Sequence, residues 1–152
     1  MLRALCYILL LTVVLLAACD ENQQKSAAVL EAEAYLESQG YTSISVVEEK
    51  SLLLTKQNLA DPAYTPIWQV QPLDSAQYID KELTSVELIV QNHPLELLYN
   101  NKKTSTIVYL HHNKVIGGWS FPVSSSETLV GNVYSLDGKT GEEVKEEELS
   151  PK

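Results

Sequence analysis

Both cysteines of this chain, Cys6 and Cys19, lie within its first 19 residues. The rest of the chain therefore has no thiol for a disulfide, a cysteine nucleophile or a thiolate metal site. It spans about 130 residues, enough for one domain that buries about two-thirds of the surface of its unfolded chain. The sequence thus predicts a single domain that an ordinary apolar core stabilises.

A short apolar segment precedes Cys19 and ends in the tetrapeptide Leu16–Cys19, LAAC. Arg3 gives this segment a positive start, and its apolar residues 5–16 are fewer than the ~20 that a permanent transmembrane helix needs. Small residues directly before the cysteine are typical of a bacterial lipobox. We expect cleavage just before Cys19, so that residues 1–18 are a signal peptide that is removed.

This segment resembles the N-terminus of bacterial lipoprotein precursors. The resemblance implies that the Cys19 thiol is joined to a diacylglyceryl group and that Cys19 becomes the mature N-terminus. Two acyl chains hold a protein stably on a membrane, whereas one chain gives only marginal binding. The expected location is therefore the outer, extracytoplasmic face of the cell membrane. The alternative is an uncleaved transmembrane helix or an ordinary secretory signal in which Cys19 is incidental.

The charge of the chain is strongly acidic. It has 11 basic and 20 acidic residues and a formal net charge of −9. Loss of Arg3 with the signal peptide makes the mature part more acidic still. Such a domain is repelled by phosphate backbones, so no nucleic-acid partner is expected. Part of the excess lies in a glutamate-rich segment near the C-terminus, and we expect residues 145–152 to be a solvated, frayed acidic tail.

One helix is predicted at the start of the domain. Residues 19–25 hold the lipidated cysteine and a polar tether, and Ser26 follows as a helix N-cap. Gly40 is placed to end the helix in a left-handed conformation, with Tyr41 packing back. The apolar stripe of this helix consists of Ala28, Val29, Ala32, Tyr35 and Leu36.

About six short strands are predicted after this helix, separated by turn residues. The segments with strand-like patterns are 43–48, 51–56, 67–71, 83–91, 106–112, 114–121 and 129–136. The first two are expected to form a hairpin at Glu49-Lys50. The sequence therefore predicts an α+β domain over residues 26–144, in which the N-terminal helix packs on a curled antiparallel sheet. A small closed barrel is the alternative architecture.

The three histidines do not form a metal-binding pattern. His111 and His112 are adjacent on a predicted strand, so we expect their side chains on opposite faces of the sheet, where they cannot share a metal ion. His93 directly precedes Pro94 and is expected to orient the start of a short helical turn. No metal site and no cofactor are predicted.

Motifs of nucleophilic catalysis are absent from the sequence. It has no G-x-S-x-G elbow, no S-x-x-K and no P-loop. The glutamate excess does not predict two carboxylates that converge in a cleft. We therefore expect a protein that is not an enzyme.

The most distinctive internal segment is Gly117-Gly118-Trp119. Two glycines inside a strand usually mark a bulge, a sharp coil of the sheet or the close approach of another backbone. The first interpretation is that they let the sheet bend so that Trp119 and Phe121 can pack. The second is a partner-binding groove at Gly117, Gly118, Trp119 and Phe121, with His93 as a further candidate.

Three segments resemble a family of small, uncharacterised lipoproteins of Gram-positive bacteria. In this family an N-H-P-L segment, a V-I-G-G-aromatic-S-F-P strand and a final Y-S-L-D-G-K hairpin recur in this order, as they do here at residues 92–95, 115–122 and 134–139. The similarity covers residues 52–144 and implies a lipid-anchored extracytoplasmic domain without implying an activity. The helix, the strands and the ending D-G-K-T-G-E are also faintly similar to PepSY-type domains.

The leading functional hypothesis is a membrane-tethered, non-enzymatic module that binds a protein, peptide or cell-wall component through its sheet. Tethering raises the effective concentration of nearby membrane partners. One alternative is an extracytoplasmic hydrolase that uses His93 or His112 with a nearby carboxylate. The other is an envelope structural protein that self-associates.

Overall fold

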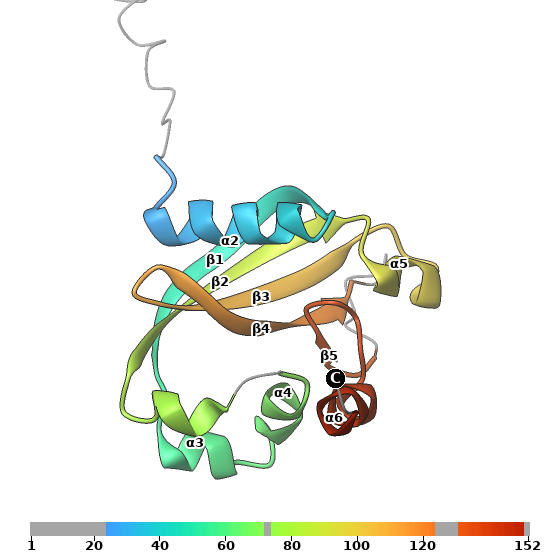
Figure 1. The fold of residues 1–152 in the computed structure, drawn as a ribbon. Coiled ribbons are helices and arrows are strands. Elements are labelled where there is room, and N and C mark those ends of the chain that lie inside the picture. The colour runs from blue at the N-terminus through green and yellow to red at the C-terminus, as the bar shows by residue number, and fades with distance from the viewer. Residues whose placement is uncertain (1–23, 72–73, 124–130, 151–152) are drawn as a thin grey trace, which may run out of the picture.

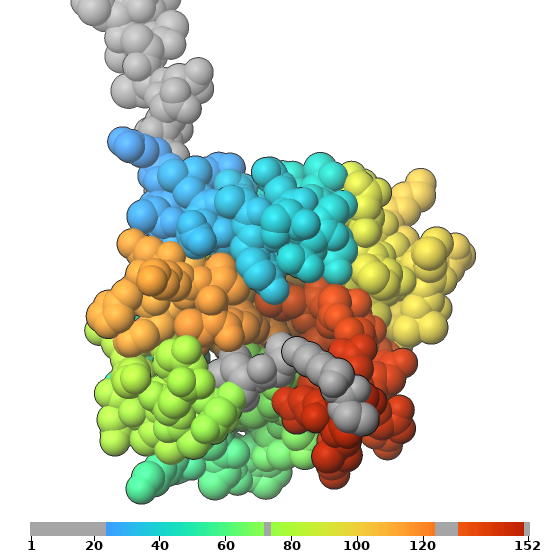
Figure 2. Space-filling view, viewed as in Figure 1, coloured from blue at the N-terminus to red at the C-terminus, as the bar shows by residue number. Residues whose placement is uncertain are grey.

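The fold of the chain is seen in a computed structural model that describes residues 24–71, 74–123 and 131–150. Helix α2 (Ala27–Ser38) covers one face of a curled antiparallel sheet, and shorter helices lie beyond the opposite face (Figure 1). Figure 2 shows the same layering, with the blue surface of α2 above the orange surface of the last long strands. The predicted fold class, α+β with the N-terminal helix packed on the sheet, is confirmed.

Within the described residues the sheet has five strands, where about six were expected, in the order in which they occur along the chain. They are β1 (Thr42–Leu53), β2 (Glu82–Gln91), β3 (Thr104–His111), β4 (Lys114–Pro122) and β5 (Tyr134–Ser135). Every neighbouring pair is antiparallel. Within the described residues β1 pairs with β2 alone, so the sheet is open and the barrel alternative was wrong.

Short helices connect or follow the strands. They are α3 (Lys56–Ala60), α4 (Thr65–Gln69), the 3-10 helix η1 (Ser75–Tyr78), α5 (Pro94–Tyr99) and α6 (Gly141–Leu149). Figure 1 shows α3, α4 and α6 on the side of the sheet away from α2. The sheet face away from α2 is therefore covered by several short helices instead of one long helix.

Helix α2 begins and ends at the residues that the sequence predicts. The Ser26 hydroxyl accepts a hydrogen bond of 3.1 Å from the Val29 amide. Gly40 has a φ of +89°, a conformation that glycine adopts without strain. The Tyr41 amide then donates to the Leu36 carbonyl over 3.1 Å, which closes the last turn.

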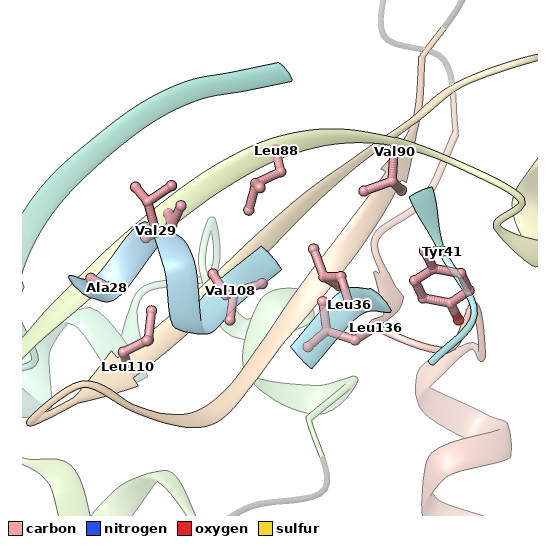
Figure 3. Packing of buried hydrophobic residues seen from close by; sticks show 11 residues of the cluster. Ala28, Val29, Leu36, Tyr41, Leu88, Val90, Val108, Leu110 and Leu136 are labelled. Atoms are coloured by element: carbon pink, nitrogen blue, oxygen red, sulfur yellow. The ribbon is translucent and has the colours of Figure 1, made fainter. Parts of the chain in front are cut away.

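The core lies between α2 and the sheet (Figure 3). Its buried members are Ala28, Val29, Ala32, Leu36, Tyr41, Val86, Leu88, Val90, Val108, Leu110 and Leu136. Burial of one such leucine or valine side chain contributes about 1.5–3 kcal/mol. Val86, Leu88 and Val90 share this face as predicted, so the intervening residues of β2 and β3 point to the other face.

The expected hairpin at Glu49-Lys50 was wrong. These residues lie within the continuous strand β1, where Glu49 pairs with Val86 and Lys50 pairs with Ser85. The segment lacks the glycine or asparagine that a two-residue hairpin turn requires. Irregularities between Ser43 and Ser45 and between Val46 and Glu48 interrupt the alternation without reversing the chain.

The strand predicted at residues 67–71 was also wrong, because most of this segment belongs to helix α4. Pro66 occupies the first turn of this helix, where the missing amide hydrogen costs nothing and the fixed φ is favourable. Five alternating residues are too few to distinguish a strand from a single helical turn.

The C-terminal segment differs from its prediction in two ways. Only Tyr134–Ser135 of the strand expected at 129–136 pairs with β4, and residues 129–130 lie outside the described residues. The acidic tail is not frayed over its first residues, because α6 extends to Leu149. The Thr140 hydroxyl accepts from the Glu143 amide, and the Glu143 carboxylate accepts from the Thr140 amide, so a capping box starts the helix.

Candidate functional site

The sheet face opposite α2 carries a concave cavity of about 500 Å³. Strands β1 to β4 supply most of its wall, and Tyr64 and Ile67 close it from the α4 side. The lining residues are Glu48, Lys50, Ser51, Leu52, Tyr64, Ile67, Ser85, Glu87, Ser105, Ile107, Tyr109, Trp119, Phe121 and Val133. This volume lies in the range of small-molecule sites, about 300–1,000 Å³. We call it the sheet cavity.

The floor of the sheet cavity is aromatic. Ile107 on β3 pairs with Trp119 on β4, and Ser105 pairs with Phe121, so alternate side chains of both strands point the same way. The Trp119 indole donates a hydrogen bond of 3.1 Å to the Tyr109 hydroxyl. This bond fixes the indole plane against the neighbouring strand.

Tyr109 links the floor to helix α4. Its ring stacks on Trp68 of α4, with centroids 5.5 Å apart and an interplanar angle of 19°. Only 7% of Tyr109 is exposed. Burial raises the pKa of its hydroxyl above 10.0, and the hydrogen bond from Trp119 opposes this shift. The hydroxyl is therefore neutral at physiological pH.

Three charged side chains line the sheet cavity. Glu48 on β1 and Glu87 on β2 are direct partners in the strand register. The Lys50 ammonium lies 2.6 Å from the Glu48 carboxylate, and this hydrogen bond is the largest cause of the raised pKa of Lys50. The Ser105 hydroxyl donates to Glu87 over 2.8 Å. Lys50 thus pairs with Glu48, while Glu87 accepts from Ser105 and has no ion pair among the described residues.

A second, more open cavity of about 810 Å³ lies between α4 and α6. Val133 lines both cavities, and Trp68 lines the second while stacking on the floor of the first. Among the described residues, the Trp68 indole nitrogen and the Gln71 side-chain oxygen are buried without a hydrogen-bond partner.

Gly118 lies behind the sheet cavity and shapes the strand that forms its floor. A Cβ atom on Gly118 would lie 2.2 Å from the Ile107 carbonyl oxygen. The register shifts between Tyr109 and Leu110, which pair with Gly117 and Val115, so Ile116 is the extra residue of a bulge. The two glycines were expected to mark a bulge, a sharp coil of the sheet or a close backbone approach, and a bulge and a close approach are both present.

Gly117 and Gly118 line a separate cavity of about 270 Å³ beside Tyr35 and Asp137. The structure therefore brings together only two of the five predicted partner-binding residues, Trp119 and Phe121, in the sheet cavity.

His93 is a buried cap of helix α5, as its position before Pro94 predicts. Its Nδ1 accepts a hydrogen bond of 3.2 Å from the Leu95 amide. Its Nε2 lies 3.0 Å from the Leu136 carbonyl oxygen and donates to it. Burial lowers the pKa of His93 below 6.5, although the bond to Leu136 opposes this shift. Both ring nitrogens are thus engaged with backbone atoms.

The prediction that His111 and His112 face opposite sides of the sheet was wrong. His112 and Asn113 have φ values of +51° and +57°, so they form the two-residue turn between β3 and β4. This turn takes His112 out of the strand, and its ring lies 4.0 Å from the His111 ring. Within the described residues, no three histidine, cysteine or acidic side chains are grouped to hold a metal ion.

Sequence reasoning missed several residues of the site. Tyr109, Ile107 and Ser105 alternate on β3, and Ser85 and Glu87 alternate on β2. This period indicates a shared face, but it does not indicate that the face is concave. Glu48 was not predicted as a site residue, because the expected hairpin placed it beside a turn instead of within the continuous strand β1.

Three further findings concern the membrane anchor and the relatives of the chain. In the described part of the chain no helix is long and apolar enough to cross a membrane. Cys19 lies outside the described residues. Comparison of the chain with family models, curated proteins and solved structures finds no match.

Proposed function

We propose that the protein is a lipid-anchored extracytoplasmic binding module, held to the membrane by a diacylglyceryl group on Cys19. Its sheet cavity binds an apolar or aromatic group of an envelope ligand. The observation that carries this proposal is the cavity itself, whose floor is formed by Trp119 and Phe121 of β4 beside Ile107 and Tyr109 of β3.

The composition of the cavity suits a binding role. Ligand sites are lined mostly by apolar and aromatic side chains, with a few polar groups that orient the ligand. Indole and phenol rings supply large contact areas, and tryptophan and tyrosine are therefore enriched at binding sites. The Ser105 hydroxyl and the Glu87 carboxylate are the polar groups at the β2–β3 wall.

The position of the proposed tether also supports the proposal. The chain reaches the domain at Ser26, directly before α2, and α2 covers the face opposite the sheet cavity. Residues 20–25 can span at most about 20 Å. An anchor at Cys19 thus attaches on the α2 side and leaves the cavity face free for ligand. The resemblance to small Gram-positive lipoproteins agrees with this arrangement.

Binding is favoured over hydrolysis by the state of the histidines. Both ring nitrogens of His93 contact backbone atoms, so neither is available to take a proton from a substrate. His112 lies at a hairpin turn and does not line the sheet cavity.

The experiment follows the indole N–H signals of the full-length protein in a non-ionic detergent by NMR. The chain has two tryptophans, so the signal lost in W119F identifies Trp119. We expect 2-(1-naphthyl)ethanol, a neutral aromatic alcohol, to shift this signal saturably. Phe121→Ala removes one aromatic side chain from the floor of the cavity and should weaken binding about tenfold, since buried aromatic area contributes roughly 1.5 kcal/mol or more.

Leu97→Ala is the matched control, because Leu97 is 91% exposed on α5 and lies outside the sheet cavity. Partition of the alcohol into detergent is the same for both variants and cancels in the comparison. An alcohol that leaves the Trp119 signal unmoved, or that binds F121A as well as the unchanged protein, would contradict the proposed function.

A further inference from the structure

We propose that the ligand of the sheet cavity is a small organic amine, with its ammonium group between Glu48 and Glu87 and its apolar body against Trp119 and Phe121. This inference rests on the proposed function and names the chemical class of the ligand. It follows from the charges of the cavity wall, from its aromatic lining and from the charge of the whole chain.

The two carboxylates of the cavity wall exceed its positive charge. Glu48 and Glu87 are directly opposite on neighbouring antiparallel strands, and both line the cavity. Like charges in this relation are destabilising unless a cation lies between them. Lys50 is the only basic residue among the described lining residues, so their wall carries one negative charge more than it neutralises. A second cation would neutralise the remaining negative charge.

Lys50 is held only weakly by Glu48. Its side chain is 60% exposed, and that of its partner Glu48 is 50% exposed. Exposed ion pairs of this kind contribute little to stability, because solvent screens the charges and both side chains lose freedom. A ligand ammonium can therefore take over a carboxylate from Lys50 at little cost.

The aromatic residues of the cavity also favour a cation. Tyr64, Tyr109 and Trp119 line the same cavity. The faces of indole and phenol rings carry negative quadrupole density and attract cations within about 6 Å. The Tyr109 hydroxyl is neutral and adds no charge to the cavity. Aromatic rings beside two carboxylates favour an ammonium group on an apolar body over a neutral or anionic ligand.

The charge of the chain acts in the same direction. Its formal net charge of −9 creates a field that concentrates cations and repels anions near the surface. A carboxylate ligand would meet this field and then both glutamates. The sheet cavity thus attracts cations in two ways, through the field of the whole chain and through the two glutamates that contact the ligand.

The experiment compares three ligands that share one aromatic body on the full-length protein in non-ionic detergent. They are 2-(1-naphthyl)ethylamine, 2-(1-naphthyl)ethanol and 3-(1-naphthyl)propionate, and the Trp119 indole signal reports binding. We expect the amine to bind about tenfold more tightly than the alcohol and the propionate to bind more weakly than both. Added salt should reduce the preference for the amine.

Three variants test the role of each charge. Glu48→Gln and Glu87→Gln keep the shape of the side chain and should each reduce the preference for amine over alcohol severalfold. Glu49→Gln is the control, because Glu49 is on the same strand but outside the cavity, where it accepts from the Ser26 hydroxyl. Lys50→Gln removes the resident cation and should tighten amine binding.

The possible outcomes separate this inference from the proposed function. If the alcohol binds and the amine binds no better, the cavity is a binding site but the amine assignment is wrong. If the propionate binds more tightly than the amine and Lys50→Gln weakens its binding, Lys50 recognises an anion and the inference is overturned. If none of the three ligands shifts the Trp119 signal, the proposed function fails as well.

Discussion

The Gly118 backbone lies against the Ile107 carbonyl group so closely that a Cβ atom on Gly118 would come within 2.2 Å of its oxygen. The same added atom would lie 2.9 Å from the Leu136 side chain. This contact sets the spacing of β3 and β4 next to the pair of Ile107 and Trp119 that forms the floor of the sheet cavity.

The first prediction is that Gly118→Ala destabilises the domain strongly. The new methyl group forces the two strands apart, and we expect a loss of more than about 2 kcal/mol in the free energy of unfolding. Gly40→Ala is the control, since a Cβ atom there has nothing within 4 Å and only the φ of +89° is unfavourable. Urea unfolding measures the free energy of unfolding of both variants. An equal decrease in the two variants would contradict the role assigned to the Ile107 contact.

The second prediction concerns pH and His93. Burial lowers the pKa of His93 in the folded protein below the ordinary value near 6.5. As the pH falls below about 6.5, the unfolded chain takes up the proton first, so the free energy of unfolding decreases by up to about 1.4 kcal/mol per pH unit. The loss continues until the pH passes the lowered pKa of the folded state.

His93→Asn tests this linkage, because asparagine can still cap α5 but does not titrate. Urea unfolding at about pH 7.5 and about pH 5.5 should show a smaller difference for this variant than for the unchanged protein. The variant is also expected to be less stable at the higher pH, since it loses the bond to the Leu136 carbonyl. An unchanged pH dependence would mean that His93 does not control stability in this range.

The third prediction concerns the anchor. In bacteria that process lipoproteins, the mature protein should begin at Cys19, lack residues 1–18 and carry a diacylglyceryl group, as intact-mass analysis can show. Cys19→Ser should abolish labelling by an alkyne fatty acid, whereas Cys6→Ser should retain it, because Cys6 lies within the segment that is removed. Labelling that survives in C19S, or its absence from the unchanged protein, would contradict the anchor.

The sequence alone determined the elements whose signals are local. The cap at Ser26 and the left-handed Gly40 bound α2, and the alternation of Val86, Leu88 and Val90 identified the buried face of β2. The position of His93 before Pro94 predicted its capping role. These features depend on backbone conformation and hydrophobic period, which a few neighbouring residues specify.

The tertiary structure decided the features that depend on which strands become neighbours. The long pairing of β1 with β2 turned an expected hairpin into one strand and brought Glu48 opposite Glu87. The curl of the sheet then made a cavity from residues that are far apart in sequence, such as Lys50 and Trp119. Concavity arises from the twist and bulges of the whole sheet, and no short segment of sequence encodes it, because it depends on long-range pairing.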